Sequence, residues 1–229
     1  MPSLTDPVSI IVEAFPTLAA KQILDIGCGN GVLARSLSAR GAHVAGVDPN
    51  EEALTVARHT VPSGAFYQTS AEAMPFADNS FDGAIFLNSL HHVPRSGMHQ
   101  ALREAARIVR SAGRIVIIEP LAAGSFYSVL RLVEDETDAR ASAQETIKRA
   151  LESRAFEQLR RIDYLRIEAF ADLDQFLVRV VAVEPARSAV VDKRRPELEA
   201  AFRHCASISE DGRLVLEQHM RAHVLMARA

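Results

Sequence analysis

Three glycines at alternate positions follow a short apolar run near the start of the chain, in the segment Gly27-Cys28-Gly29-Asn30-Gly31. Glycine adopts left-handed backbone and has no side chain, so such a loop turns tightly from strand to helix and lets a ligand lie against its backbone. Asp48 ends the next apolar run, 21 positions after Gly27. A carboxylate there can accept hydrogen bonds from both hydroxyls of a ribose. The two features predict a site for an adenosine-containing ligand.

A dinucleotide-binding loop shares this design, but its fingerprint requires a third glycine where this chain has Val32. It also does not require Asp25 at the start of the loop. The negative charge of Asp25 suits a ligand with an ammonium or sulfonium group better than one with two phosphates. The predicted cofactor is therefore S-adenosylmethionine, with a nicotinamide dinucleotide as the alternative. A strand-to-helix turn without any ligand is a third interpretation, which the spacing of Asp25 and Asp48 disfavours.

The elements that position these residues alternate between strand and helix. Apolar runs predict strands over residues 22–26, 43–47, 65–68, 81–87 and 114–119, and apolar stripes at helical spacing predict helices after residues 31, 50 and 97. Asn50 precedes two glutamates and is the predicted N-cap of its helix. Such alternation predicts an α/β fold with a doubly wound, mostly parallel, seven-stranded Rossmann-like sheet.

The second half of the chain has a different pattern. Helical stripes through residues 121–206, with a capping box at Asp172 and Gln175, predict a helical insert that forms a lid and acceptor pocket over the site. Phe126, Leu130 and Phe176 either line that pocket or belong to a core, and residues 163–170 fit a strand or a helix. Two strands, over residues 213–218 and 221–226, are expected to close the sheet edge.

These patterns predict one domain, residues 1–229, with four segments. They are an N-terminal helical segment, residues 1–22; a cofactor-binding core, residues 23–120; the helical lid, residues 121–206; and C-terminal strands, residues 207–229.

Four motifs occur in a fixed order, namely ILDIGCGNG over residues 23–31, GVDPNEEAL over 46–54, SAEAMPFADNSFDGAIFLNSLHHV over 70–93 and LREAARIVRSAGRIVIIEP over 102–120. With them the chain resembles the class I S-adenosylmethionine-dependent methyltransferases, in the broad group that includes the ubiquinone/menaquinone C-methyltransferases and many small-molecule methyltransferases. The resemblance covers residues 23–119. It is specific for fold and cofactor and uninformative about the acceptor.

The resemblance also implies which residues contact the cofactor. The amino-acid part is lined by Asp25, Gly27, Cys28 and Gly29; the ribose is bound by Asp48; the adenine is contacted by Ser70, Ala71 and Glu72; and the main chain of Asn88 borders the methionine. Several of these residues also have ordinary explanations: Ser70 and Glu72 as polar loop residues, Asn88 as a cap of the following segment, and Cys28 as a small filler of the loop.

Methyl transfer from a sulfonium needs little covalent help, because alignment of nucleophile, methyl and sulfur can contribute about 7–11 kcal/mol. The catalytic residues are therefore unknown from the sequence. If the acceptor is a phenol or an amine, a neutral histidine near the methyl group can remove its proton. His91 and His92 follow the strand over residues 81–87 and are the candidates. The alternative is that one packs under a helix and the other faces solvent.

Composition excludes several classes of protein. The chain has 229 residues, of which 48% are hydrophobic and 24% charged, so it can bury a sizeable core. Its two cysteines, Cys28 and Cys205, predict neither a disulfide framework nor a metal site. Apolar runs stay well short of the roughly 20 residues of a membrane span, and the first 22 residues lack the pattern of a secretory signal. The prediction is a cytoplasmic protein without a membrane partner.

A net charge of −3 gives no general attraction to nucleic acid. Residues 140–166 carry seven Arg and Lys against four Asp and Glu, which is typical of a solvated helix face and less often of an RNA-binding one. We therefore predict methyl transfer to an O, N or C atom of a small molecule, with nucleic acid disfavoured as the partner. The alternatives are a regulatory protein that binds the cofactor without transfer chemistry, and a nicotinamide-dependent reductase.

Overall fold

The computed structural model describes residues 3–4 and 6–228. The chain forms two compact units, each built from separate stretches of sequence. The core unit comprises residues 6–119, 142–162 and 221–228, and the insert unit comprises residues 3–4, 120–141 and 163–220. Within the described residues, no helix has both the length and the apolar character required to cross a bilayer.

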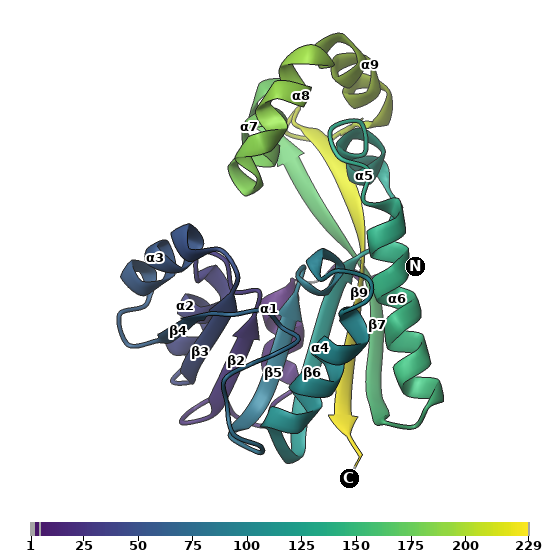
Figure 1. Cartoon of the computed structure of the whole chain (residues 1–229). Coiled ribbons are helices and arrows are strands. Elements are labelled where there is room, and N and C mark those ends of the chain that lie inside the picture. Colours follow the sequence, from purple (N-terminus) through teal and green to yellow (C-terminus); the bar gives the residue numbers. More distant parts are fainter. Residues whose placement is uncertain (1–2, 5, 229) are drawn as a thin grey trace. The chain divides into compact units, whose positions relative to one another are not determined.

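The core unit contains the predicted parallel sheet (Figure 1). Its strands run in the spatial order β7-β9-β6-β5-β2-β3-β4. Their bounds are β2 Gln22–Ile26, β3 His43–Asp48, β4 Ala65–Gln68, β5 Phe81–Leu87, β6 Val109–Pro120, β7 Phe156–Phe170 and β9 Leu214–Ala227. Within the series β4, β3, β2, β5 and β6, each strand is parallel to the next. The mostly parallel Rossmann-like sheet expected from the sequence is thus confirmed. The expected number of seven strands is wrong, because among the described residues the two-residue strands Ser3–Leu4 and Ser207–Ile208 also pair, with β7 and β9, and make a sheet of nine strands.

Helices cover both faces of this sheet. They are α1 Pro7–Glu13, α2 Val32–Ser38, α3 Glu51–Thr60, the 3-10 turn η1 Leu90–His92, α4 Met98–Ile108 and α6 Thr137–Glu152, of which α6 also enters the insert unit. Apolar side chains of α4 and α6 share one core with Leu24 and Phe86 of the sheet. On the opposite face, a Cβ added to Gly83 would lie 2.4 Å from the ring of Phe15. The sheet is therefore doubly wound.

Helix α3 begins where the sequence predicts. The Asn50 side chain accepts hydrogen bonds from the backbone N–H groups of Glu52, at 2.9 Å, and Ala53, at 3.2 Å. These bonds satisfy N–H groups that have no partner within the first helical turn. The cap fixes the chain direction directly after Asp48, at the carboxyl end of β3.

The C-terminal strands differ from the prediction. Residues 214–227 form one continuous strand, β9, which lies between β6 and β7 and not at the sheet edge. No glycine or proline interrupts these residues, so nothing breaks the strand at His219 and Met220. Four consecutive side chains, residues 222–225, are buried, as an inner strand requires, whereas β7 is largely exposed over residues 158–161. Strand β7 is accordingly the outermost strand of the core unit.

The insert unit is helical in part. Its helices are α5 Ser125–Leu130, α7 Leu173–Val183, the turn η2 Pro185–Arg187, α8 Ser188–Lys193 and α9 Arg195–Cys205, and its short strands are β1 Ser3–Leu4 and β8 Ser207–Ile208. The predicted cap of α7 is present, since Asp172 accepts a hydrogen bond from the Gln175 N–H at 2.8 Å. The sequence left residues 163–170 open between strand and helix, and the structure shows that they are strand, the second half of β7. The first half, residues 156–162, was expected to be helical, because its charged residues hide a strand pattern.

Phe126, Leu130 and Phe176 belong to the apolar core of the insert unit. They are at most 6% exposed, and the rings of Phe126 and Phe176 are 5.4 Å apart, edge to face. Of the two interpretations offered by the sequence, the packing favours a core over a pocket lining.

Candidate functional site

The glycine loop joins β2 to α2 at the carboxyl end of β2. Gly27, Gly29 and Gly31 all have positive φ, at 73°, 49° and 76°, which explains why glycine occupies these positions. A Cβ on Gly27 would lie 2.4 Å from Ser89 Cβ, so the loop packs closely on the segment after β5. A Cβ on Gly29 would meet no atom of the described part of the chain within 4 Å. Gly29 is therefore the place where another molecule can approach the backbone.

Asp48 ends β3 beside this loop. Its Oδ2 accepts a hydrogen bond from the Gly29 N–H and its Oδ1 one from the Asn50 N–H, both at 2.9 Å. Each carboxylate oxygen can accept further hydrogen bonds, so ribose hydroxyls can still bind. The carboxylate thus links the loop that approaches the ligand to the N-terminus of α3.

Two oxygen atoms near the loop lack hydrogen-bond donors among the described residues. They are Asp25 Oδ2 and Asn88 Oδ1, both buried. Asp25 is 2% exposed, and burial, followed by the negative charge of Asp48, raises its pKa to about 7. Unpaired acceptors beside a glycine loop fit a ligand that supplies donors or positive charge and do not fit a pyrophosphate.

Asn88 follows β5 with left-handed backbone, at φ 55°. Its N–H donates to the Ile118 carbonyl at 2.8 Å, which continues the pairing of β5 with β6. The next residue, Ser89, donates from Oγ to the Ile26 carbonyl at 2.6 Å. These bonds hold the segment after β5 against the start of the glycine loop, so Asn88 lies at the same end of the sheet as Asp48.

The segment predicted to contact adenine follows β4. It is tied to β3 by a hydrogen bond from the Thr69 N–H to the Asp48 carbonyl at 3.3 Å. Ser70 is exposed and Ala71 is buried. The Glu72 side chain lies on the backbone at the start of α4, where a Cβ on Gly97 would meet its Oε1 at 2.4 Å. A carboxylate at a helix N-terminus is stabilised there, so Glu72 has a structural role besides any contact with the base.

Cys28 is a packing residue in this arrangement. It is buried, and a Cβ on Gly46 would lie 2.7 Å from its Sγ. Burial, together with the charges of Asp25 and Asp48, raises the pKa of the thiol, which keeps it protonated at neutral pH. Because the thiolate is the nucleophilic form, the structure favours the loop-filler interpretation of Cys28.

His91 and His92 lie in η1, three and four residues beyond Asn88. His91 is 5% exposed, and its Nδ1 contacts Glu119 Oε2 at the carboxyl end of β6. His92 is exposed, and its ring centroid is 4.0 Å from that of His91. The buried histidine therefore has a carboxylate that orients it. The sequence singled out neither Ser89 nor this contact of Glu119, although both follow from the pairing of β5 with β6.

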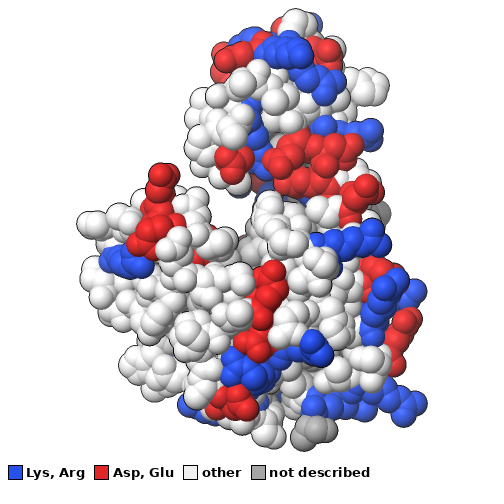
Figure 2. Space-filling view, viewed as in Figure 1, with Lys and Arg blue, Asp and Glu red and all other residues white. Residues whose placement is uncertain are grey.

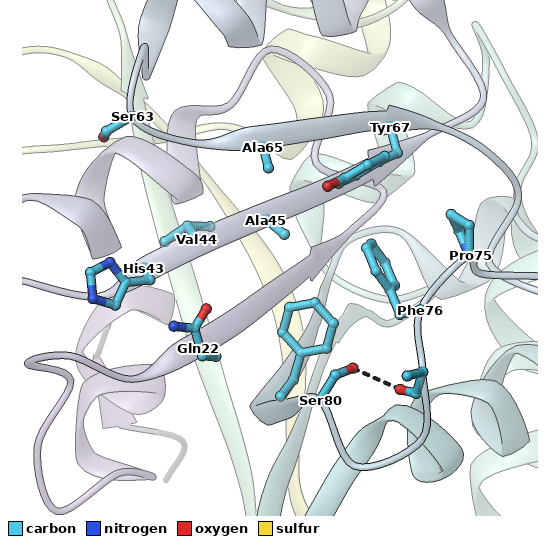
Figure 3. A pocket seen from close by; sticks show the side chains of 12 residues that line it. Gln22, His43, Val44, Ala45, Ser63, Ala65, Tyr67, Pro75, Phe76 and Ser80 are labelled. Carbon is cyan, nitrogen blue, oxygen red and sulfur yellow. Dashed lines mark hydrogen bonds between the residues drawn. The ribbon is translucent and has the colours of Figure 1, made fainter.

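A pocket of about 440 Å³ opens at the other end of the sheet (Figure 3). Gln22 and His43, the first residues of β2 and β3, lie at one side of it, and Tyr67 and Phe76 lie at the other. The ring of Phe76 makes edge-to-face contacts with the rings of Tyr67 and Phe81, which also line the pocket. None of the residues proposed above as cofactor contacts lines this pocket. It is separate from the site at the carboxyl ends of the strands.

Several of the basic residues between 140 and 166 pair with carboxylates. Arg140 bonds Glu136, Arg149 bonds Glu145, and Arg160 bonds Glu13, with N–O distances of 2.7 to 2.8 Å. On the face drawn in Figure 2, basic and acidic side chains are interspersed. The exposed pairs of Arg149 and Arg160 are typical of solvated helix and strand surfaces, whereas the pair of Arg140 and Glu136 is buried. The described side chains on the face drawn form no continuous basic groove.

The chain was compared with known proteins. Residues 24–117 match the family model described as "Methyltransferase domain". A ubiquinone biosynthesis O-methyltransferase of Stutzerimonas stutzeri is 39% identical over 109 residues, which are 45% of this chain and 46% of that protein. The match thus spans about half the length of the curated relative.

Two solved structures share the fold over nearly the whole chain. The YcgJ protein of Bacillus subtilis is 19% identical, with a TM-score of 0.68 over 97% of this chain and 98% of that chain. A methyltransferase from Geobacter sulfurreducens, solved in complex with S-adenosyl-L-homocysteine, is 14% identical, with a TM-score of 0.60 over 97% and 92%. At these identities the likeness concerns the fold alone.

Proposed function

We infer that this chain transfers a methyl group to an O, N or C atom of a small molecule. Its domain match, its motif order and its fold are those of a class I S-adenosylmethionine-dependent methyltransferase. The observation that carries the inference is the cradle at the carboxyl ends of β2, β3 and β5. It combines an open glycine backbone, a carboxylate at the end of β3 and two buried acceptor oxygens that no donor among the described residues satisfies. The matched O-methyltransferases, each covered over less than half of its length, support a small-molecule acceptor.

The residues present fit S-adenosylmethionine. Asp48 would hold the ribose, the backbone at Gly29 would lie against the cofactor, and the acceptor oxygens of Asp25 and Asn88 would face its positive groups. When bound, the cofactor supplies a methyl group on a sulfonium that is already an activated leaving group. The protein's contribution is then to hold acceptor and donor in line and to keep water out. The two buried acceptor oxygens offer no hydrogen-bond donor to the phosphates of a dinucleotide. This disfavours the nicotinamide-dependent reductase.

Transfer itself is tested with cofactor carrying a labelled methyl group and a library of phenols, amines and carbon nucleophiles. Label recovered in an acceptor supports an enzyme. Tight binding of S-adenosylhomocysteine without transfer to any member favours the regulatory alternative. A thermal shift produced by NAD and not by S-adenosylhomocysteine would contradict the cofactor assignment.

Replacing Asp48 by alanine is expected to weaken S-adenosylhomocysteine binding by about 2–3 kcal/mol, or roughly 30- to 150-fold in Kd, because hydrogen bonds to a charged acceptor contribute about 1.5–3 kcal/mol each. Calorimetry measures the change. Since Asp48 also accepts from the Gly29 and Asn50 N–H groups, Asn50→Ala is the matched control. It removes the α3 cap and keeps the carboxylate. An equal loss of binding in both variants would mean that Asp48 acts only by supporting the loop.

We also propose that residues 121–206 act as a lid over the acceptor. Strand β6 ends at Pro120, on the side of the sheet where Asp48 and Asn88 lie, and ligands of open α/β sheets bind at that side. Hydrogen exchange with and without S-adenosylhomocysteine is expected to show added protection in parts of 121–206 as well as in the glycine loop. Protection confined to residues 27–72 would contradict the lid and favour a scaffold role for these helices. The cytoplasmic location and the exclusion of nucleic acid stay predictions.

A further inference from the structure

The connection from β4 to β5 has no helix of its own. It runs over residues 69–80, all of which are described, and none of them belongs to a helix or a strand. Strands β3 and β2 lie between β4 and β5 in the sheet, and a crossover between parallel strands is usually made by a helix. The conformation of this connection therefore depends on contacts with other elements.

Helix α4 supplies such contacts through Arg107 and Glu104, which we call the clamp. The guanidinium donates to the Met74 carbonyl at 3.1 Å, to the Phe76 carbonyl at 2.7 Å and to Asp78 Oδ1 at 2.8 Å. Its other two N–H groups donate to the two carboxylate oxygens of Glu104, each at 2.8 Å. Arginine has five N–H donors in a planar fork, so all five have an acceptor here. A lysine in this position could not make the same set of bonds.

Glu104 also binds the connection directly. Its Oε2 accepts the Met74 N–H at 3.1 Å, and the hydrogen bonds from Arg107 lower the pKa of the carboxyl, which is ionised at neutral pH. The Met74 side chain is 4% exposed and belongs to the core shared by the sheet and α4. Both backbone polar groups of this buried residue are thus bound by the clamp. The backbone cannot shift at Met74 without losing these bonds.

The start of the same connection lies beside the cradle for the cofactor. The Thr69 N–H donates to the Asp48 carbonyl at 3.3 Å, while the Gly29 N–H donates to the Asp48 carboxylate. In the sheet, β4 flanks β3 on one side, and β2, which leads into the glycine loop, flanks it on the other. The base and the amino-acid part of the cofactor are attached to opposite ends of its ribose. A ribose held at Asp48, with the amino-acid part along the glycine loop, therefore directs its base toward the residues after β4.

We propose that Arg107 and Glu104 are positioning residues for the adenine, because the clamp holds the connection where residues 70–72 meet the edge of the base; this rests on the proposed function. Neither residue touches the cofactor, and both act through the backbone that leads from Ser70 to Met74. Hydrogen bonds to a base edge weaken steeply when distance and angle change. Bonds to the ribose depend on Asp48 instead. The clamp therefore sets the selectivity for adenine more than the affinity for any nucleoside.

The test of selectivity uses S-adenosylhomocysteine and S-inosylhomocysteine, in which an oxygen replaces the 6-amino group of the base. Arg107→Lys keeps the charge and loses the planar fork. It is expected to raise the Kd of S-adenosylhomocysteine about tenfold and that of S-inosylhomocysteine less than about threefold, because the inosine base lacks the bonds that the displaced segment gives up. Calorimetry measures both constants. An equal loss for the two ligands, or no loss for either, would overturn the positioning role.

Arg103→Lys is the matched control. Arg103 also lies in α4, is exposed and donates to the side chain of Gln100 in the same helix. The substitution is identical and makes no change at the connection, so both dissociation constants should stay at their wild-type values. A loss of selectivity in Arg103→Lys as large as that in Arg107→Lys would assign the effect to α4 as a whole and overturn the clamp.

Hydrogen exchange in the ligand-free protein tests the clamp without the cofactor. In Arg107→Lys and in Glu104→Gln the amides of residues 74–79 should exchange faster than in the wild type, while those of β2 and β5 stay unchanged and show that the variants are folded. Unchanged exchange over residues 74–79 would overturn the clamp. If the wild type bound neither ligand while the exchange result held, the proposed function would fail and the clamp would stand as a structural feature of the connection.

Discussion

Replacing Gly29 by valine is expected to raise the Kd for S-adenosylhomocysteine by about 1000-fold or more, which corresponds to about 4 kcal/mol. A Cβ added at Gly29 would point into open space beside the described residues, so the branched side chain would collide with the ligand and not with the protein. Its N–H also donates to Asp48, so displacement of the loop would affect the ribose contact as well. Calorimetric titration measures the loss.

Gly212→Val is the matched control for this variant. Gly212 also has positive φ, at 80°, and a Cβ there would likewise meet nothing within 4 Å, but it lies in the turn between β8 and β9. Valine at such φ costs about 1–2 kcal/mol of backbone strain in either place. The two variants should therefore lose similar stability, while only Gly29→Val loses binding. Normal binding by folded Gly29→Val would mean that the loop is merely a turn.

Much of the core unit could be predicted because its strands are buried on both faces. The inner parallel strands then have continuous apolar runs, and helices with caps separate them, so β2 and β5 occur at the residues expected. Strand β7 shows the limit of this reasoning. It is largely exposed in its first half and carries the charged residues Arg160, Arg161 and Asp163 close together. It therefore has neither a continuous run of apolar residues nor a regular alternation of apolar and polar residues.

Part of the candidate site could likewise be predicted from the sequence, and part could not. The glycine loop and Asp48 are local features with a fixed spacing, so sequence could single them out, and the structure places both at one end of the sheet. The contact between His91 and Glu119 could not be identified by spacing, because the two residues are 28 positions apart along the chain. Its placement depends on the register of β5 against β6, which sequence alone does not determine. The burial of Asp25 is likewise a property of the packed sheet.

Replacing Asp25 by asparagine is expected to remove a pH dependence of stability. Burial, and then the charge of Asp48, raises the pKa of Asp25 from 3.8 to about 7. Between these values the folded chain holds a proton on this group that the unfolded chain has lost. The stabilising contribution is therefore complete below pH about 4 and is lost as the pH rises to about 7, by at most about 4 kcal/mol.

Urea unfolding at several pH values tests this expectation. The free energy of unfolding of Asp25→Asn, minus that of the wild type, should increase between pH 4 and pH 8. Asp82→Asn should show the opposite trend. Although burial raises the pKa of Asp82, hydrogen bonds from Gln22 and Arg110 outweigh it and lower the pKa, so its contribution is lost as the pH falls. A pH-independent difference for Asp25→Asn would contradict a protonated Asp25 in the folded protein.

The same proton links Asp25 to the cofactor. S-adenosylmethionine carries positive charge on its sulfonium and ammonium groups, so binding beside Asp25 favours the ionised carboxylate and expels the proton. Calorimetry at pH 6.5 in two buffers with different ionisation enthalpies counts the protons released. The wild type should release a substantial fraction of a proton on binding, and Asp25→Asn should release none. Equal release by the two proteins would assign the proton to another group and would leave Asp25 as a structural carboxyl of strand β2.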